Sequence, residues 1–199
     1  MGPPRNQLLI IFYRNPKMGT VKTRLAATLG DEKALAIFRR LAQHTNAITK
    51  GLAVDKVVYY SDSIEPDDIW LPTIYRKSVQ TGTDLGEKMK NGFPEGFEAG
   101  YEVICIIARD WHELSGPLIE KALDLLRSSD TVIGPARDGG YYLLGMRRLY
   151  PELFTNKQWS TETVAGDTIH EFELLELKYS KLPTLRDVDR EDDVPAGWI

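Results

Sequence analysis

The sequence is short of cysteine, of histidine and of long apolar runs. Its only cysteine, Cys105, lies inside the apolar run 103–107, so no disulfide can form within the chain and a buried thiol is expected. The three histidines have no recognised metal-ligand spacing. No apolar stretch is long enough to cross a bilayer, and the N-terminus lacks the apolar core of a signal peptide, so we expect a cytoplasmic protein.

A surplus of positive charge is also missing. Lysine and arginine number 25 against 29 aspartates and glutamates, a net charge of −4, which gives no general electrostatic reason to bind nucleic acid or an anionic membrane. A small anionic ligand can still meet local positive charge.

With 42% apolar residues in 199, the chain can fill one sizeable core. We predict one domain over 8–190, with an extension at 1–7 and an acidic tail at 191–199.

Apolar runs alternate with amphipathic segments along the chain, which is typical of an α/β fold. Strands are predicted at 8–13, 54–60, 73–78, 103–108, 131–134 and 141–146. Helices are predicted after Asp31, Asp84 and Ser115, each placed to cap its helix, and over 161–173. Residues 174–179 fit either a strand or an extension of that helix. The pattern predicts a three-layer α/β/α domain with a mostly parallel sheet.

In such a sheet, ligands bind beyond the carboxyl ends of the strands. The loop after strand 8–13 carries four cations and a glycine: Arg14, Lys17, Gly19, Lys22 and Arg24. Fixed cations and backbone amides near a helix start can hold a phosphate, although a solvated basic turn explains the loop equally well. The loop is not a P-loop, because the residue before Lys22 is not glycine.

Carboxylates follow two other segments. Asp110 comes directly after strand 103–108, where it could bind Mg²⁺ or Mn²⁺ opposite a diphosphate, or could cap a helix or pair with a cation. Asp187 and Asp189 lie on one side of an extended segment, which suits a divalent metal but is also common in acidic surface loops.

The segment 134–142 combines an aspartate, two glycines and two tyrosines. Gly139 and Gly140 permit positive φ and close approach of the backbone to a ligand. Tyr141 and Tyr142 face opposite sides of a strand, so one could stack on a ligand while the other packs in the core. A simple Asp-Gly turn leading into a strand is the alternative.

Five segments in the same order resemble motifs of the DUF2064 family. RNPKMGTVKTRLAATLG resembles the opening FARxPxPGxVKTRLAxxLG, QTGTDLGEKM resembles QxGxDLGERM, and GPARDGGYYLLGM resembles GPAxDGGYYLIGL; QWSTETV and LPTLRDVD match the later WST and LxDVD motifs. The match runs from Leu8 to Asp189. This family comprises bacterial glycosyltransferase-like proteins with the nucleotide-diphospho-sugar transferase (GT-A) fold.

The resemblance implies a nucleotide-diphosphate-sugar site. It places Arg14, Lys22 and Arg24 around the base and phosphates. It places Asp110 toward Mg²⁺ or Mn²⁺, with Asp189 as a second ligand. It places Asp138, Gly139, Gly140 and Tyr141 near the sugar, and Trp159, Ser160 and Thr161 on the side of an acceptor that the sequence does not identify. Asp110 and Asp138 are the expected catalytic carboxylates.

One segment departs from the family pattern. Where the family has GSDCP, this chain has Ala108, Arg109, Asp110, Trp111 and His112. Arg109 could bind phosphate bidentately in place of a cation, or the added bulk could block the site. We therefore expect a metal-assisted transferase that prefers glycosyl transfer. The alternatives are a non-catalytic protein that binds a nucleotide or a partner, and a nucleotidyltransferase.

Overall fold

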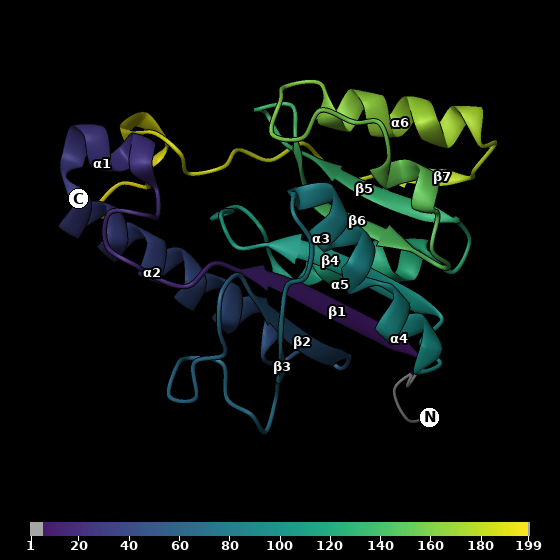
Figure 1. The fold of residues 1–199 in the computed structure, drawn as a ribbon, viewed down its shortest axis with the longest axis horizontal. Coiled ribbons are helices and arrows are strands. Elements are labelled where there is room, and N and C mark those ends of the chain that lie inside the picture. The colour runs from purple at the N-terminus through teal and green to yellow at the C-terminus, as the bar shows by residue number, and fades with distance from the viewer. Residues whose placement is uncertain (1–5, 199) are drawn as a thin grey trace.

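The computed structural model describes residues 6–198, which form one sheet with helices on both faces (Figure 1). The strands are β1 (Gln7–Tyr13), β2 (Asp55–Tyr60), β3 (Arg76–Val79), β4 (Val103–Ala108), β5 (Thr131–Pro135), β6 (Tyr141–Met146) and β7 (Tyr179–Lys181). The helices are α1 (Thr23–Leu29), α2 (Asp31–Thr49), α3 (Leu85–Gly92), α4 (Pro94–Glu98), α5 (Gly116–Leu125) and α6 (Val164–Leu174), with short 3₁₀ turns η1 (Pro151–Phe154) and η2 (Glu191–Asp193). The predicted α/β fold is confirmed. Residues 1–5 of the expected N-terminal extension lie outside the described residues.

The sheet is mostly parallel, as predicted, in the order β3-β2-β1-β4-β6-β5-β7. The exception among the described strands is β6, which runs antiparallel to both β4 and β5. Residues 136–140 are therefore the turn of a hairpin, closed by a hydrogen bond that Ala136 N donates to Gly140 O (2.9 Å). Because β5 points the same way as β4 and β1, this turn lies at the edge where all three strands end.

Both faces of the sheet are buried, which explains why its strands are continuous apolar runs. Alternate residues of β1 face opposite layers: Leu9 and Ile11 pack with α2 and α5, whereas Leu8 and Ile10 pack with α3 and α6. Cys105 in β4 is fully buried, as expected, and burial raises the pKa of its thiol. Between residues 6 and 198, no helix combines the length and apolar character that a bilayer span requires.

The predicted helix caps differ in outcome. Asp84 caps α3 as expected, since its Oδ1 accepts a hydrogen bond from Glu87 N (2.8 Å). Asp31 and Ser115 do not cap their helices: Asp31 is the first residue of α2, and the Ser115 side chain makes no capping hydrogen bond to α5. The ambiguous segment 174–179 leaves α6 and turns into the short edge strand β7.

The C-terminal residues pack against the α1–α2 side. Val194 and Trp198 cover the small apolar cluster of Leu25, Ile37 and Leu41. The chain reaches that cluster from β7 by passing along the edge of the sheet, so its residues 187–189 run beside the ends of β4 and β5. The domain limits at residues 8 and 190 stay predictions.

Candidate functional site

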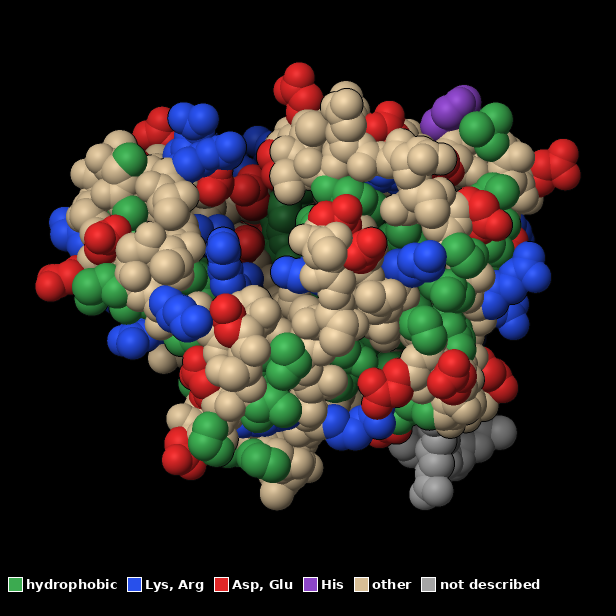
Figure 2. All heavy atoms as spheres, in the orientation of Figure 1, with side chains coloured by type: hydrophobic (Ala, Val, Ile, Leu, Met, Phe, Trp, Pro, Cys, Tyr) green, Lys and Arg blue, Asp and Glu red, His purple; other side chains and the backbone are tan. Residues whose placement is uncertain are grey.

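A cleft of about 1020 Å³ opens at the edge where β1, β4 and β5 end. Figure 2 shows basic and acidic side chains gathered around this hollow, between the α1–α2 side and α6. Its lining comes from the residues after β1, β2, β3 and β4, from the turn between β5 and β6, from the loop before α6, and from residues 187–189. Segments far apart in the sequence thus meet at one place, as expected for the carboxyl edge of a parallel sheet.

Most of the side chains singled out in the sequence line this cleft. They are Arg14, Arg24, Arg109, Asp110, Asp138, Gly140, Tyr141, Trp159, Ser160, Thr161 and Asp189. Gly19, Lys22 and Gly139 do not line it. The buried Lys22 side chain lies against Asp110, and Gly139 packs against the backbone of Glu162. The structure therefore brings the residues together, while their roles stay predictions.

The basic side of the cleft includes Lys22, a residue with a strained backbone conformation. Lys22 precedes α1 in the left-handed region (φ 50°), which a non-glycine residue occupies only at a cost. Its side chain is 6% exposed, and Nζ lies 2.9 Å from Asp110 Oδ1, an ion-pair contact without hydrogen-bond alignment. Arg109 Nη2 lies 3.8 Å from the same oxygen. Two cations thus share one carboxylate oxygen.

Asp110 is ionised because of these two neighbours. Burial by itself would raise the pKa of this carboxyl, but Arg109 and Lys22 outweigh burial and lower the pKa to about 2. Asp110 therefore carries its negative charge throughout the neutral range and fixes both cations beside the cleft.

Asp110→Asn is expected to destabilise the protein at pH 7 by about 2 kcal/mol, because one pKa unit corresponds to roughly 1.4 kcal/mol. The folded-state pKa lies below the ordinary value of 3.8, so the stabilisation is present above pH 4 and is lost as the pH falls toward 2. Urea unfolding at a series of pH values measures this as a difference from wild type that shrinks in acid. The exposed Asp124→Asn variant serves as control. Parallel pH profiles for Asp110→Asn and wild type would contradict the assignment.

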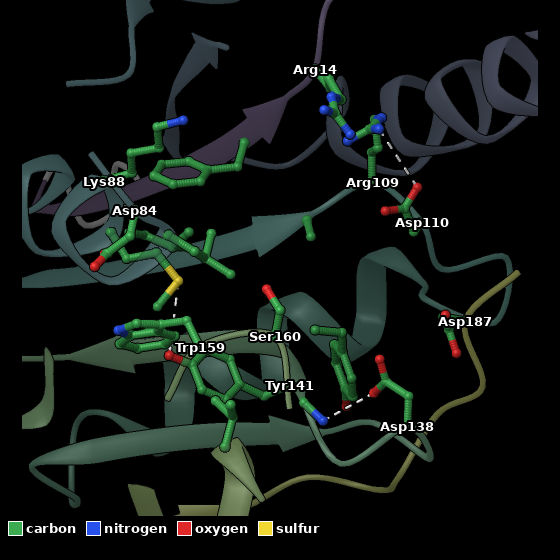
Figure 3. A pocket seen from close by; sticks show the side chains of 18 of the residues that line it. Arg14, Asp84, Lys88, Arg109, Asp110, Asp138, Tyr141, Trp159, Ser160 and Asp187 are labelled. Carbon is green, nitrogen blue, oxygen red and sulfur yellow. Dashed lines mark hydrogen bonds and ion pairs between the residues drawn. The ribbon is translucent and has the colours of Figure 1, made fainter. Parts of the chain in front are cut away.

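The opposite half of the cleft is acidic. Val188 N donates a hydrogen bond to Asp110 O (3.1 Å), which holds Asp187 and Asp189 near the end of β4. Asp189 pairs with Arg24 (2.7 Å). Burial and the nearby Asp138 raise the pKa of Asp187 to about 6. Asp187 and Asp138 have no ion-pair partner in the described part of the chain, and Figure 3 shows both facing the hollow.

An aromatic wall closes the third side. Trp159 packs directly on Gly86 at the start of α3 and stacks on Phe154, with ring centroids 6.4 Å apart. Tyr141 reaches Met89, with its hydroxyl 3.8 Å from Sδ. As predicted, the paired tyrosines divide between the faces of the sheet, since Tyr142 packs in the other layer against Trp111. Trp111 and Tyr142 are buried there, and both also line the inner wall of the cleft.

The segment that follows β3 also contributes to the cleft, although its residues are not among the predicted site residues. Gln80, Thr83, Asp84, Leu85 and Lys88 all line the cleft. Gln80 is held by hydrogen bonds that its Nε2 donates to the carbonyl of Tyr59 (2.8 Å) and to that of Tyr13 (3.4 Å). The sequence does contain a signal that this segment contributes to the site, because its residues come shortly after the predicted strand 73–78 and belong to the motif QTGTDLGEKM.

Gly86→Ala is expected to displace Trp159 and to lower the free energy of unfolding by about 1–2 kcal/mol. A Cβ atom at Gly86 would overlap the indole of Trp159, so the ring must leave α3. Near-ultraviolet circular dichroism and urea unfolding measure the two effects. Gly166→Ala is the matched control, since this helical glycine has open space around it. Equal stability of the two variants would contradict the packing described.

The metal ligands predicted from the sequence do not form an open site. Asp110 is engaged by Lys22, and Asp189 by Arg24. Among residues 6–198, no three His, Cys, Asp or Glu side chains are grouped so that they could hold a metal ion. The donor set at Asp110 and Asp189, as arranged, does not fit a divalent ion, because its charges are already compensated by basic side chains.

Comparison with known proteins gives three kinds of result. A family model described as "Uncharacterized protein conserved in bacteria (DUF2064)" matches residues 39–161. A crystal structure of a candidate nucleotide-diphospho-sugar transferase from Desulfovibrio desulfuricans G20 is 31% identical, with 94% of this chain and 83% of that chain covered and a TM-score of 0.85. No curated protein matches the chain.

Two more distant structures share the fold. One is an inositol-1-phosphate CTP transferase from T. maritima (10% identity, 98% of this chain and 94% of that chain, TM-score 0.56). The other is a 4-diphosphocytidyl-2C-methyl-D-erythritol synthase from Anaerococcus prevotii DSM 20548 (11% identity, 95% and 94%, TM-score 0.56). At these identities the likeness concerns the fold alone.

Proposed function

Since the chain belongs to the DUF2064 family and has the fold of nucleotide-diphospho-sugar transferases, we propose that it transfers a glycosyl group from a nucleotide-diphosphate sugar to an acceptor hydroxyl. The observation that carries the proposal is the separation, within one cleft, of the arginines Arg14 and Arg109 from Asp138, Asp187 and Trp159 (Figure 3). A nucleotide-diphosphate sugar has the same separation, since an anionic diphosphate is joined to a neutral, hydroxyl-rich ring.

The basic half suits the diphosphate. Arg14 and Arg109 line the cleft on this side, Arg24 lines it while paired with Asp189, and Lys22 adds its charge beside Asp110. Glycosyl transfer breaks the bond between the anomeric carbon and a diphosphate oxygen, so negative charge grows on the departing nucleoside diphosphate. Fixed cations beside that oxygen stabilise the charge in the transition state.

The acidic half suits the sugar and the acceptor. Carboxylates such as Asp138 and Asp187 accept hydrogen bonds from hydroxyl groups, and Trp159 adds apolar surface to the wall of the cleft. In this proposal the acceptor oxygen attacks the anomeric carbon and loses its proton to Asp138. Asp110 forms ion pairs with Lys22 and Arg109 and is given no step in the transfer. No step is assigned to the divalent ion expected from the sequence, because the residues at Asp110 and Asp189 do not fit it.

Thermal unfolding with a panel of nucleoside mono-, di- and triphosphates and nucleotide-diphosphate sugars tests the proposal, with and without Mn²⁺. We expect a nucleotide-diphosphate sugar to give the largest stabilisation, about 2.7 kcal/mol at a hundredfold excess over Kd. That corresponds to a rise in Tm of roughly 5–10 °C for a chain of this size. Lys22→Ala should reduce the rise, while Lys121→Ala on the exposed face of α5 should not.

The same panel separates the alternatives. Slow release of nucleoside diphosphate from the stabilising sugar nucleotide supports glycosyl transfer. A dominant response to a triphosphate, with release of inorganic diphosphate in the presence of a phosphate ester, indicates nucleotidyl transfer. Stabilisation without turnover of any nucleotide with any acceptor indicates a binding protein. No response to any sugar nucleotide contradicts the proposal.

A further inference from the structure

We propose that the guanidinium groups of Arg14 and Arg109 form a fixed anion site that binds a diphosphate without a divalent metal. The identity of the natural diphosphate compound rests on the proposed function. The ability of these two side chains to bind diphosphate is a separate property and can be tested without it. Arg109 stands where the resembled motif GSDCP has serine, so this half of the site is particular to this chain, whereas Arg14 belongs to the opening motif that the chain shares with the family.

Arg109 is held rigidly with unused hydrogen-bond donors. The residue follows β4, is 9% exposed, and lays its guanidinium over the ring of Phe38, 4.2 Å from the centroid. Its buried Nε has no hydrogen-bond partner in the described structure, and its nearest carboxylate, Asp110, lies 3.8 Å away. A guanidinium has five N–H donors in a planar fork that matches phosphate oxygens. Arg109 lines the cleft with a side chain that is 11% exposed, so a ligand there can accept hydrogen bonds from the part of the guanidinium that reaches the cleft, but not from the fully buried Nε.

A second guanidinium faces the first. In Figure 3 the side chains of Arg14 and Arg109, from the ends of β1 and β4, point toward one another. Burial is the largest cause of the lowered pKa of Arg109, and Arg14 lowers it further. Two like charges repel at such a position unless an anion lies between them. A phosphate group between the two forks would receive hydrogen bonds from both.

The charged side chains around Arg14 and Arg109 leave an excess of positive charge that such an anion can neutralise. Arg14 has no ion pair within residues 6–198, and the nearby Asp62 is paired with Lys17 (3.4 Å). Of the three cations Arg14, Lys22 and Arg109, the last two form ion pairs with a single carboxylate, Asp110, and this leaves 3 − 1 = +2 charges, which Asp62 and Asp187 offset only from a greater distance. The diphosphate of a nucleotide sugar carries about two negative charges at neutral pH. The protein thus supplies the counter-charge that a metal supplies elsewhere.

Isothermal titration with inorganic diphosphate, in EDTA and separately in MnCl₂, tests the inference on the full chain. We expect binding in EDTA that weakens with added salt, and a loss of about 10- to 100-fold in affinity in Arg109→Gln and in Arg14→Gln. Arg109→Lys should recover part of the loss, because it restores the charge but not the fork. Arg147→Gln, an exposed arginine at the opposite edge of the sheet, should bind like wild type.

Asp110→Asn distinguishes a cation site from a metal site. Removing this carboxylate removes a competitor for Lys22 and Arg109, so diphosphate should bind at least as tightly in EDTA. If a metal on Asp110 bridged the diphosphate, the same variant would lose binding. Arg14 is exposed, so Arg14→Gln keeps the test decisive even if Arg109→Gln does not fold.

The outcomes also separate this inference from the proposed function. Diphosphate binding in EDTA that depends on Arg14, without a response to any sugar nucleotide, supports the anion site and contradicts the transferase. Sugar-nucleotide binding that requires Mn²⁺ and is unaffected by Arg14→Gln overturns the anion site and supports the transferase.

Discussion

Gly139→Ala is expected to lower the free energy of unfolding by about 3–5 kcal/mol, because two separate penalties add at this position. Gly139 has φ 87°, which strains any residue with a Cβ atom. That atom would also overlap the backbone of Glu162, where no flexible side chain can yield. Urea unfolding and Tm measure the loss, with a fall of roughly 2–4 °C for each kcal/mol.

The neighbouring glycine provides the control for this prediction. Gly140 has no positive φ, and a Cβ there would lie 3.3 Å from Asp138 Oδ1, the end of a side chain that can turn away. Gly140→Ala should therefore cost well under half as much. Because Gly139 O accepts a hydrogen bond from Ala165 N (2.8 Å), Gly139→Ala should also weaken any ligand response that depends on the loop before α6. Equal stability of the two variants would show that the turn is not locked against Glu162.

Lys77→Met is expected to cost about 3–5 kcal/mol, because it leaves a buried carboxylate without its cation. Lys77 Nζ lies 2.8 Å from Asp68 Oδ1, and the two side chains are only 9% and 8% exposed. Methionine keeps the apolar stem but removes the charge and the bond to Glu65 O (2.7 Å). Equilibrium unfolding in urea measures the loss.

A double-mutant cycle checks the cause of that loss. Asp68→Asn combined with Lys77→Met should recover part of the stability, since no charge is then buried alone. Arg127→Met breaks an ion pair of similar kind whose side chains are 63% and 67% exposed, so it should cost less than about 1 kcal/mol. A similar cost for Lys77→Met and Arg127→Met would mean that burial does not make the Lys77–Asp68 pair more important for stability than an exposed ion pair.

The fold follows from local features of the sequence to a large extent. The runs in β1 and β4 are apolar at every position because both faces of the sheet are covered, and their polar ends mark the edge where the cleft forms. The direction of β6 was not predictable in this way. A buried strand has the same apolar pattern in either direction, and only the short hairpin turn at 136–140 makes β6 antiparallel.

Which residues meet at the site could be predicted from their positions after strands, but their pairing could not. Arg24 and Asp189 are separated by 165 positions, and nothing local to either residue indicates that they form an ion pair. The same is true of Lys22 and Asp110, whose contact depends on the left-handed conformation of Lys22. The metal prediction at Asp110 and Asp189 rested on the positions of the carboxylates and on the family resemblance, and it did not include the cations that the tertiary structure places beside them.

The stack of Arg109 on Phe38 has a consequence for the thermodynamics of binding. A long side chain that becomes ordered only when its ligand arrives loses about 0.5–1.5 kcal/mol of rotational freedom at that moment. Arg109 is immobilised when the protein folds, so it contributes its hydrogen bonds without that entropic penalty, whereas the exposed Arg14 must still be ordered. With Arg109 fixed in advance and Arg14 free to adjust, the same cleft would bind diphosphates that carry different sugars.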